Sequence, residues 1–328
     1  MKRVAKPAGK FNIVVEDAPL PAPGAHEVRI RAVRTLISRG SEIGRRYTRE
    51  EAIDPAIMGY SMAGVIDALG EGVDHYAVGD RVVASAPHAQ FVVRRVRLAS
   101  PADQPDVFPL PARVTWDQAP YWPLAAGAVT WIDIEQIRRD DTVVIVGQGL
   151  VGSLLMQVAK ANGNGRIIVI DALPSRCALA AALGADVVID AAKDDPVRAV
   201  RRLTNGVGAD IVAYAVGGPA GPKAFQQAQD MVATGGLLHL IGLYENQALP
   251  LDSGKIQRRR LLGGYYGRAT GAGEARRALE LIASGAIQPD RMTTHHFPFT
   301  QAAAAFDVLY SRMHEALGVL LDWDVAGT

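Results

Sequence analysis

The sequence has almost no cysteine, no long apolar run and no excess of one charge. Cys177 is the only cysteine among 328 residues, so a disulfide within the chain is impossible and a thiolate zinc site is nearly so. No apolar run reaches the roughly 18 residues that a membrane span requires. Lys and Arg number 35 against 34 for Asp and Glu, and this balance does not suggest nucleic acid or another polyanion as a partner.

The rest of the composition is that of a folded protein with a large core. Hydrophobic residues make up 49% of the chain, and its length suggests two domains. The basic start at residues 1–7 is followed by no apolar segment, which argues against a secretory signal and predicts a cytoplasmic protein. Cys177 lies in a helical pattern, where a buried structural thiol is the favoured interpretation and a reactive thiol the alternative.

Three glycines mark the stretch around which the chain is organised. A β-branched apolar run at 142–146 predicts a buried parallel strand. It is followed by glycines in the spacing G-x-G-x-x-G and then by a helical pattern at 153–160. Such a turn lets a pyrophosphate approach the backbone at a helix N-terminus. The predicted cofactor residues of the turn are Gly147, Gln148, Gly149, Leu150, Val151 and Gly152.

An acidic residue supports this interpretation. The apolar run at 166–170 ends in Asp171, about 20 residues beyond the glycines, where a carboxylate can accept hydrogen bonds from ribose hydroxyls. Asp171 favours NAD over NADP because it would repel a 2′-phosphate. Arg176 leaves NADP open, since it could reach that phosphate or stack on adenine. The alternative for the whole motif is a ligand-free turn with Asp171 as a helix cap.

The second half of the chain alternates between strand and helix patterns. Strands are expected near 143–147, 166–171, 187–190, 210–215, 237–241 and 261–265. This alternation predicts an α/β fold with a doubly wound parallel sheet, and six strands match two mononucleotide-binding halves.

The first 115 or so residues are β-rich. Short strands are expected at 11–16, 26–33, 59–66, 80–84 and 90–93, and they suggest a small barrel-like unit. Residues 101–111 are proline-rich and are predicted to form a loop, and 117–136 is mostly helical. The tail is expected to contain helices at 273–284 and 301–311, an extended piece at 295–299 and a strand at 316–321. This tail could return to the first domain and complete it.

The order of these parts resembles the medium-chain dehydrogenase/reductase superfamily, the relatives of alcohol and polyol dehydrogenases. The resemblance covers essentially the whole chain, and it is carried by the glycine turn and by the sequences at 21–28, 70–82, 183–186 and 285–306. It implies a GroES-like catalytic domain at 1–118 and 268–328 and a Rossmann domain at 119–267. It also implies a small-molecule substrate and a homodimer. Residues after the fourth and fifth Rossmann strands would line the nicotinamide: Val216, Gly217, Ile241, Gly242 and Leu243.

The departures from the superfamily pattern concern zinc. Zinc-dependent members place a catalytic Cys where this chain has Ser38, and a His-Glu pair where it has Tyr60 and Ser61. The lobe with four cysteines that holds a structural zinc is absent. Serine and tyrosine hydroxyls are poor substitutes for the usual zinc ligands. The resemblance is therefore to a zinc-lacking branch, in which a protein group or water handles the proton.

Five residues of the first domain are candidates for the chemistry: Ser38, Glu42, Tyr60, Ser61 and His88. Tyr60 could transfer a proton, or it could fill the volume of a lost ligand. Glu42 could anchor substrate or act as a base, although a structural ion pair with an arginine is favoured. His88 is an acid/base candidate, or an exposed or strand-edge residue. Tyr121 and Trp122 could form a pocket wall, although aromatic packing is favoured, and His295 and His296 are expected to be structural.

Three functions remain open at this stage. The first is a zinc-independent, NAD-linked alcohol dehydrogenase or ketone reductase acting on a polar, polyol-, cyclitol- or sugar-like substrate. The second is an NADPH-dependent ene or quinone reductase. The third is a dinucleotide-binding protein without turnover, and the sequence does not identify the substrate.

Overall fold

The computed structural model describes residues 1–96, 106–163, 165–242, 248–267 and 269–324. By its internal contacts the chain divides into two compact units. Unit 1 comprises 1–123, 271–284 and 289–328, and unit 2 comprises 124–270 and 285–288. The sequence analysis places the domain boundaries at 118/119 and 267/268. Both units are assembled from the strand and helix patterns expected from the sequence.

Unit 2 contains a six-stranded parallel sheet with the order β10-β9-β8-β11-β12-β13. The strands are β8 (Thr142–Val146), β9 (Arg166–Asp171), β10 (Val187–Asp190), β11 (Ala209–Tyr214), β12 (Val232–Leu240) and β13 (Arg260–Gly263). The strand order reverses between β8 and β11, which is the topology of a doubly wound dinucleotide-binding sheet. The predicted fold class is confirmed, and each of the six expected strands is present.

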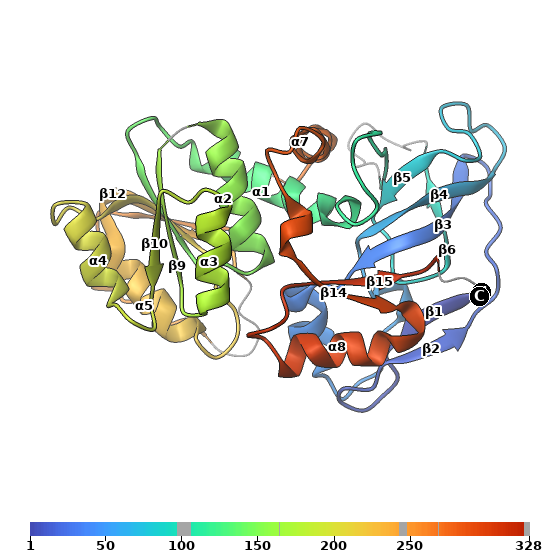
Figure 1. The fold of residues 1–328 in the computed structure, drawn as a ribbon, viewed down its shortest axis with the longest axis horizontal. Helices are drawn as coiled ribbons and strands as arrows, with labels where there is room; N and C mark the ends of the chain where they lie inside the picture. Colours follow the sequence, from blue (N-terminus) through green and yellow to red (C-terminus); the bar gives the residue numbers. More distant parts are fainter. Residues whose placement is uncertain (97–105, 164, 243–247, 268, 325–328) are drawn as a thin grey trace. The chain divides into compact units, whose positions relative to one another are not determined.

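Helices cover both faces of this sheet (Figure 1). They are α1 (Trp122–Glu135), α2 (Leu150–Asn162), α3 (Pro174–Ala182), α4 (Pro196–Leu203), α5 (Gly221–Met231) and the short α6 (Ser253–Ile256). Alternate residues of the central strands, such as Val144 and Val146, pack in one core with Val200 of α4 and Phe225 of α5. Because the opposite face is buried too, the strands are continuous apolar runs rather than alternating ones.

Unit 1 is built mainly from antiparallel strands. Its larger sheet has the order β14-β15-β3-β4-β5-β7, with β6 also pairing with β3, and β1 and β2 form a separate ribbon. The strands are β1 (Lys2–Ala5), β2 (Val14–Asp17), β3 (Glu27–Leu36), β4 (Met62–Leu69), β5 (Arg81–Ala84), β6 (Phe91–Arg95), β7 (Val107–Pro109), β14 (Thr293–Pro298) and β15 (Gly318–Asp322). The tail therefore returns to the first part of the chain, as predicted.

The helical elements of unit 1 connect these strands. They are η1 (Arg39–Tyr47, a π-helix), the 3₁₀ turns η2 (Pro55–Ile57), η3 (Ala119–Tyr121), η4 (Pro289–Met292) and η5 (Phe299–Gln301), and the helices α7 (Ala272–Ala283) and α8 (Ala302–Ser311). Residues of α8 and of strands β3, β4 and β15 share one apolar core. At the edge of this core the rings of Phe299 and Trp323 stack with their centroids 4.8 Å apart.

Two segments differ from the prediction. The segment 101–111 is not entirely loop, because β7 pairs with β5 as an edge strand. Pro109 is compatible with that position, since an edge strand needs no hydrogen-bond donor on its outer side. The helical stretch predicted at 117–136 starts as the 3₁₀ turn η3, and α1 begins only at Trp122.

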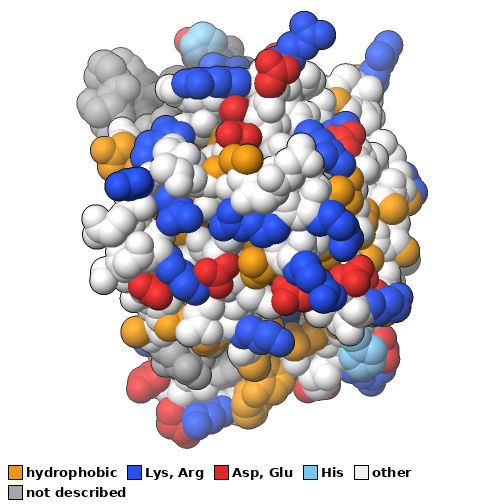
Figure 2. Space-filling model, turned by 90° about the vertical axis from the view of Figure 1, so that its left-hand side faces the viewer, with side chains coloured by type: hydrophobic (Ala, Val, Ile, Leu, Met, Phe, Trp, Pro, Cys, Tyr) orange, Lys and Arg blue, Asp and Glu red, His pale blue; other side chains and the backbone are white. Residues whose placement is uncertain are grey.

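The surface agrees with the charge balance of the sequence. On the face shown in Figure 2, Lys and Arg side chains are interspersed with acidic and apolar ones, without a large area of one charge. Among the described residues, no helix is long and apolar enough to cross a membrane.

Candidate functional site

The glycine turn of unit 2 lies between β8 and α2. Gly147 has φ +94°, a conformation that favours glycine. A Cβ on Gly152 would lie 1.8 Å from the carbonyl oxygen of Gly147, so any side chain there would force the helix away from the strand. A Cβ on Gly149 would meet nothing within 4 Å. The turn thus presents bare backbone to open space at the first residue of α2, which fits a pyrophosphate group.

Asp171 lies directly beside this turn. Its Oδ2 accepts a hydrogen bond from the Gln148 N–H at 2.7 Å, and its Oδ1 accepts one from the Leu173 N–H at 2.9 Å. The Nη1 atom of Arg176 is 3.9 Å from Oδ2. Burial lowers the pKa of the Arg176 guanidinium, and Asp171 opposes that shift. The carboxylate is therefore fixed at the ends of β8 and β9, where a ribose would be bound.

The loops after β11 and β12 approach the same edge of the sheet. The N–H groups of Ile241 and Gly242 both donate to the Tyr214 carbonyl, at 3.0 and 2.8 Å. A Cβ on Gly242 would lie 2.9 Å from the carbonyl oxygen of Val216, so the two loops touch through their backbones. Gly217 follows Val216 and is exposed. Leu243 lies outside the described residues. The described residues of unit 2 therefore fit a nicotinamide dinucleotide.

Residues of unit 1 that were candidates for the chemistry separate into two groups. Ser38 directly precedes η1 as its N-cap residue, and its hydroxyl makes no hydrogen bond to the described residues. Tyr60 is partly exposed and lines a hollow of about 230 Å³ in unit 1. Ser61 is buried, and its hydroxyl donates to the Pro120 carbonyl. The Ser38 hydroxyl is available for a substrate, Tyr60 lines the hollow, and the Ser61 hydroxyl donates its hydrogen bond to the protein.

Glu42 and His88 form the second group, a buried network. His88 Nε2 lies 2.8 Å from Glu42 Oε1, and His88 Nδ1 lies 2.8 Å from the Thr35 hydroxyl oxygen. That hydroxyl also accepts a hydrogen bond from the Trp323 indole at 2.9 Å, and Glu42 Oε2 accepts one from the Ser38 N–H at 2.8 Å. The network joins η1, β3, the loop before β6 and the end of β15.

This network corrects two interpretations of the sequence. The ion-pair partner of Glu42 is a histidine and not an arginine. His88 is completely buried, so it is not a solvent-exposed residue. Because both nitrogens of His88 are engaged inside the protein, a direct proton transfer from His88 to a substrate has no support in this geometry.

Aromatic residues near the domain boundary are packed into the protein. Tyr121 is fully buried, and its hydroxyl lies 2.8 Å from that of Thr293. Burial raises the pKa of the Tyr121 phenol far above its ordinary value. Trp122 packs against Phe108 with the ring centroids 5.2 Å apart. Aromatic packing, the favoured interpretation of Tyr121 and Trp122, agrees with these contacts.

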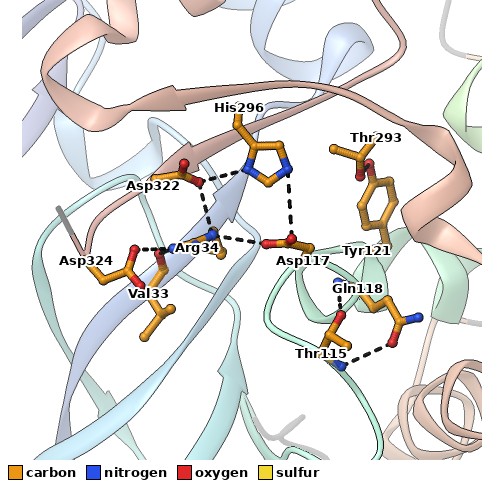
Figure 3. Close-up of polar contacts among 10 residues, drawn as sticks. All are labelled: Val33, Arg34, Thr115, Asp117, Gln118, Tyr121, Thr293, His296, Asp322 and Asp324. Atoms are coloured by element: carbon orange, nitrogen blue, oxygen red, sulfur yellow. Dashed lines mark hydrogen bonds and ion pairs between the residues drawn. The ribbon is translucent and has the colours of Figure 1, made fainter.

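The structure also places His296, which belongs to a charged cluster around Arg34 (Figure 3). Arg34 Nε lies 3.1 Å from Asp117 and 3.0 Å from Asp322, and Nη1 contacts Asp324. His296 Nδ1 lies 3.2 Å from Asp322 Oδ1. Burial alone would lower the pKa of Arg34, but the three aspartates outweigh it and raise that pKa. The cluster connects β3, β14, β15 and the turn before η3, a structural role.

Cys177 likewise has a structural setting. It is buried, and its thiol donates to the Asp171 carbonyl at 3.4 Å. Burial raises the pKa of this thiol, and the nearby carboxylates add to the shift. A raised pKa disfavours the reactive thiolate.

Zinc does not fit the residues at Ser38, Tyr60 and Ser61. Hydroxyls are poor zinc ligands, and the nearby carboxylate and imidazole of Glu42 and His88 already bind each other. Within the ranges that the structure describes, no group of three His, Cys, Asp or Glu side chains is placed to hold a metal ion.

Comparisons with known proteins agree with the fold and the cofactor turn. The family model described as "Zinc-binding dehydrogenase" matches residues 151–284, and "Alcohol dehydrogenase GroES-like domain" matches residues 24–96. The chain belongs to the medium-chain dehydrogenase/reductase superfamily. It is an oxidoreductase of the NAD(P)-dependent dehydrogenases that act on CH–OH groups.

Individual relatives match over nearly the full length. L-threonine 3-dehydrogenase of Bacillus subtilis is 26% identical, with 95% of this chain and 96% of the relative covered. Sorbitol dehydrogenase of the same species is 27% identical, with 94% of each chain covered. The solved structure of alcohol dehydrogenase TADH from Thermus sp. ATN1 is 26% identical and has a TM-score of 0.82, with 98% of this chain and 99% of that chain covered.

Two arginines of unit 1 were not singled out from the sequence. Arg46 on η1 and Arg94 on β6 line the same hollow as Tyr60. Arg94 could have been recognised from the sequence of β6. It lies two residues after the buried Val92, so both side chains belong to the same face of the strand. A charged residue at an inward position of a strand is an exception to the usual pattern and invites a functional explanation. Arg46 follows another arginine in an irregular helix, and no sequence signal separates the two.

Proposed function

We propose that the protein is a zinc-independent, NAD-linked alcohol dehydrogenase or ketone reductase acting on a polar, polyol-, cyclitol- or sugar-like substrate. Unit 2 would bind the dinucleotide, and unit 1 would bind the substrate. Two features of the chain together carry the proposal. Unit 2 has an open glycine turn, and unit 1 has hydroxyl side chains where zinc-dependent relatives have metal ligands.

The absence of metal ligands at Ser38, Tyr60 and Ser61 supports zinc independence. Zinc in a catalytic site usually has three protein ligands from Cys, His, Asp or Glu. The chain offers none of these at the three positions. Glu42 cannot serve as a replacement without leaving His88 buried and unpaired, which is energetically unfavourable.

The proton that accompanies hydride transfer must then be handled by a protein group or water. The nicotinamide supplies or accepts the hydride. Tyr60 carries a phenol at the wall of the unit 1 hollow, and Ser38 carries a hydroxyl that makes no hydrogen bond to the described residues. We assign proton transfer to Tyr60 and orientation of the substrate oxygen to Ser38. Glu42 and His88 act as positioning residues, because the Glu42 carboxylate holds the backbone N–H of Ser38.

The preference for NAD rests on Asp171. Its carboxylate is held by two backbone N–H groups beside the glycine turn, and a 2′-phosphate placed there would be repelled. Arg176 does not remove this preference, because its guanidinium lies on the Asp171 carboxylate. The polar substrate class is supported by the sorbitol dehydrogenase relative.

Metal analysis combined with a substrate panel tests the proposal. The purified protein is expected to contain much less than one zinc per chain and to keep its activity in EDTA. It should reduce NAD with at least one polyol, cyclitol or sugar, and Tyr60→Phe should lower kcat by about 10²-fold or more. Stoichiometric zinc whose removal abolishes activity would refute zinc independence. Turnover confined to enones or quinones with NADPH would instead identify an ene or quinone reductase.

We also propose that the protein is a homodimer formed through the β13 edge of unit 2. No described strand pairs with the outer edge of β13, and Tyr265 and Tyr266, which follow it, are 49% and 65% exposed. An open strand edge next to exposed aromatic rings is suited to pairing with a second copy. Light scattering after size exclusion should give twice the mass of the chain, and a monomer at micromolar concentration would exclude this assembly.

A further inference from the structure

The hollow in unit 1 contains two arginines that lack a carboxylate partner. Arg46 comes from η1 and Arg94 from β6, so distant parts of the chain bring the two guanidinium groups to one hollow. Arg46 donates to the Ile57 carbonyl. Arg94 donates to the carbonyls of Ser85, at 2.5 Å, and Val93, at 2.8 Å. Among the described residues, neither arginine has an ion pair with Asp or Glu.

Arg94 is partly buried, so its charge is less well solvated than that of a fully exposed arginine. Burial lowers the pKa of its guanidinium, and Asp106 opposes that shift only from a distance. An arginine stays protonated in proteins, so the charge remains. A partly buried charge that has no ion pair is stabilised when an anion approaches it. Carbonyl partners satisfy some N–H groups but carry no compensating full charge.

The remaining wall of the hollow supplies further polar groups. Ser85 is partly exposed, and its hydroxyl makes no hydrogen bond to the described residues, while its N–H donates to the Asp106 carbonyl at 2.8 Å. Tyr60 lines the same space. The volume of about 230 Å³ is below the roughly 300–1,000 Å³ typical of whole-ligand pockets. It suits one charged group of a ligand better than the whole molecule.

The wall is also closely packed. Gly59 has φ +102°, and a Cβ there would lie 2.8 Å from the backbone nitrogen of His88. The backbone before Tyr60 is therefore packed directly on His88, whose ring is held by Glu42. Because Glu42 and Arg46 belong to the same short helix, the buried pair fixes the helix that carries one of the two arginines.

We propose that this hollow binds the phosphate group of a phosphorylated polyol or sugar, with Arg46 and Arg94 as its ligands. Guanidinium groups match phosphate oxygens in geometry and charge, and two of them balance a dianion. Ser85 donates a further hydrogen bond to the phosphate. This inference rests on the proposed function, because it names the class of substrate for the same unit.

Binding of inorganic phosphate and of sorbitol 6-phosphate to the full-length protein tests the proposal, with sorbitol as the neutral control ligand. Calorimetric titration should detect both phosphates at millimolar or lower concentration and should not detect sorbitol. Arg46→Gln and Arg94→Gln should each weaken binding by about 10-fold or more. Their neighbours Arg45 and Arg95 are exposed, so Arg45→Gln and Arg95→Gln are matched controls that should leave affinity within about twofold.

Several outcomes separate a specific site from general attraction and from loss of fold. Equal losses in the control variants would overturn the proposal, as would the absence of phosphate binding by the unmodified protein. Arg94→Lys keeps the charge and should retain more affinity than Arg94→Gln, and thermal unfolding of each variant identifies a folding defect. Phosphate binding that depends on the two arginines, without any dehydrogenase turnover, would support this inference while refuting the proposed function. Turnover of unphosphorylated polyols without phosphate binding would support the proposed function and overturn this inference.

Discussion

Glu42 and His88 form a salt-bridged pair with no exposed surface on either side chain, and their Oε1 and Nε2 atoms lie 2.8 Å apart. The pair connects η1 to the loop before β6 within unit 1. It supports Ser38 through a backbone hydrogen bond and Tyr60 through the packing of Gly59 on His88. The two residues that we assign to substrate chemistry are thus held by groups that do not themselves reach a substrate.

The first prediction concerns the stability provided by this pair. Glu42→Ala should lower the free energy of unfolding by about 3–5 kcal/mol, because it leaves the His88 ring buried without its partner. Urea unfolding followed by fluorescence measures the change. Glu71→Ala, at an exposed position, is the control, and its free energy of unfolding should differ from that of the parent protein by no more than about 0.5 kcal/mol. A loss below about 1 kcal/mol for Glu42→Ala would show that the pair has no structural role.

The second prediction separates two glycines of the cofactor turn. Gly149→Ala should change the free energy of unfolding by less than about 1 kcal/mol. The new methyl group meets no protein atom within 4 Å, and the φ of −71° suits alanine. It should nevertheless weaken NADH binding by about 10-fold or more, since the methyl group occupies the space expected for the pyrophosphate.

Gly152→Ala should behave differently. Its methyl group would lie 1.8 Å from the Gly147 carbonyl oxygen, so stability should fall by about 1–3 kcal/mol or more. Fluorescence titration with NADH and thermal unfolding of both variants provide the comparison. Unchanged NADH affinity in Gly149→Ala would place the dinucleotide elsewhere.

The third prediction concerns cofactor choice. Asp171→Asn removes the negative charge beside the turn and should weaken NAD binding by about 10- to 100-fold, the range expected for a charge-assisted hydrogen bond. The ratio of kcat/KM for NAD to that for NADP should fall with it. Asp190 occupies the same register on the neighbouring strand, so Asp190→Asn is the control and should leave the ratio unchanged. A protein that already prefers NADP would contradict the role of Asp171.

The fourth prediction concerns a second buried pair, in unit 2. Glu135 Oε1 lies 2.9 Å from His239 Nδ1, and His239 Nε2 lies 2.8 Å from the Gly264 carbonyl oxygen. The other oxygen of Glu135 is buried and has no partner among the described residues. Burial raises the pKa of the Glu135 carboxyl, and the interaction with His239 only partly offsets this rise.

The sign of the pH effect follows from this raised pKa. The folded state holds a proton that the unfolded state releases, so the contribution of Glu135 is complete below the unfolded pKa near 4.5 and is lost as pH rises through the folded pKa. Glu135→Gln should remove this loss, because an amide can donate to His239 without titrating. Unfolding measured from pH 4 to pH 8 should show the variant gaining stability relative to the parent as pH rises. Asp140→Asn, at an exposed position, should show no such trend.

The sequence predicted the features that depend on local patterns. The strands β8 and β9 of unit 2 are nearly continuous apolar runs next to glycine, and the turn from Gly147 to Gly152 has the spacing of a close strand-to-helix connection. The return of the tail to the first part of the chain was also predicted, because the superfamily resemblance assigns 268–328 to the first domain, and β15 does pair with β3.

Features that depend on distant contacts were not predicted. Glu42 and His88 are 46 residues apart, and nothing in either local pattern indicates that they meet. The same holds for Arg34 and the aspartates at 322 and 324, and for the approach of Arg46 to the hollow that Arg94 lines. The burial of a charged side chain is decided by which segments pack over it, and that information is tertiary.

The position of β15 has a consequence for the order in which the chain assembles during synthesis. Unit 2 is nearly continuous in sequence. The sheet of unit 1 is complete only when β15 pairs with β3, and the Thr35 hydroxyl of β3 then accepts a hydrogen bond from the Trp323 indole. On the ribosome β6 can pair with residues 27–31 of β3 early, but residues 34–36 must stay unpaired on this side until the whole of unit 2 has been translated. An exposed strand edge is prone to wrong pairing, so we expect the nascent chain to depend on chaperones until its last strand emerges.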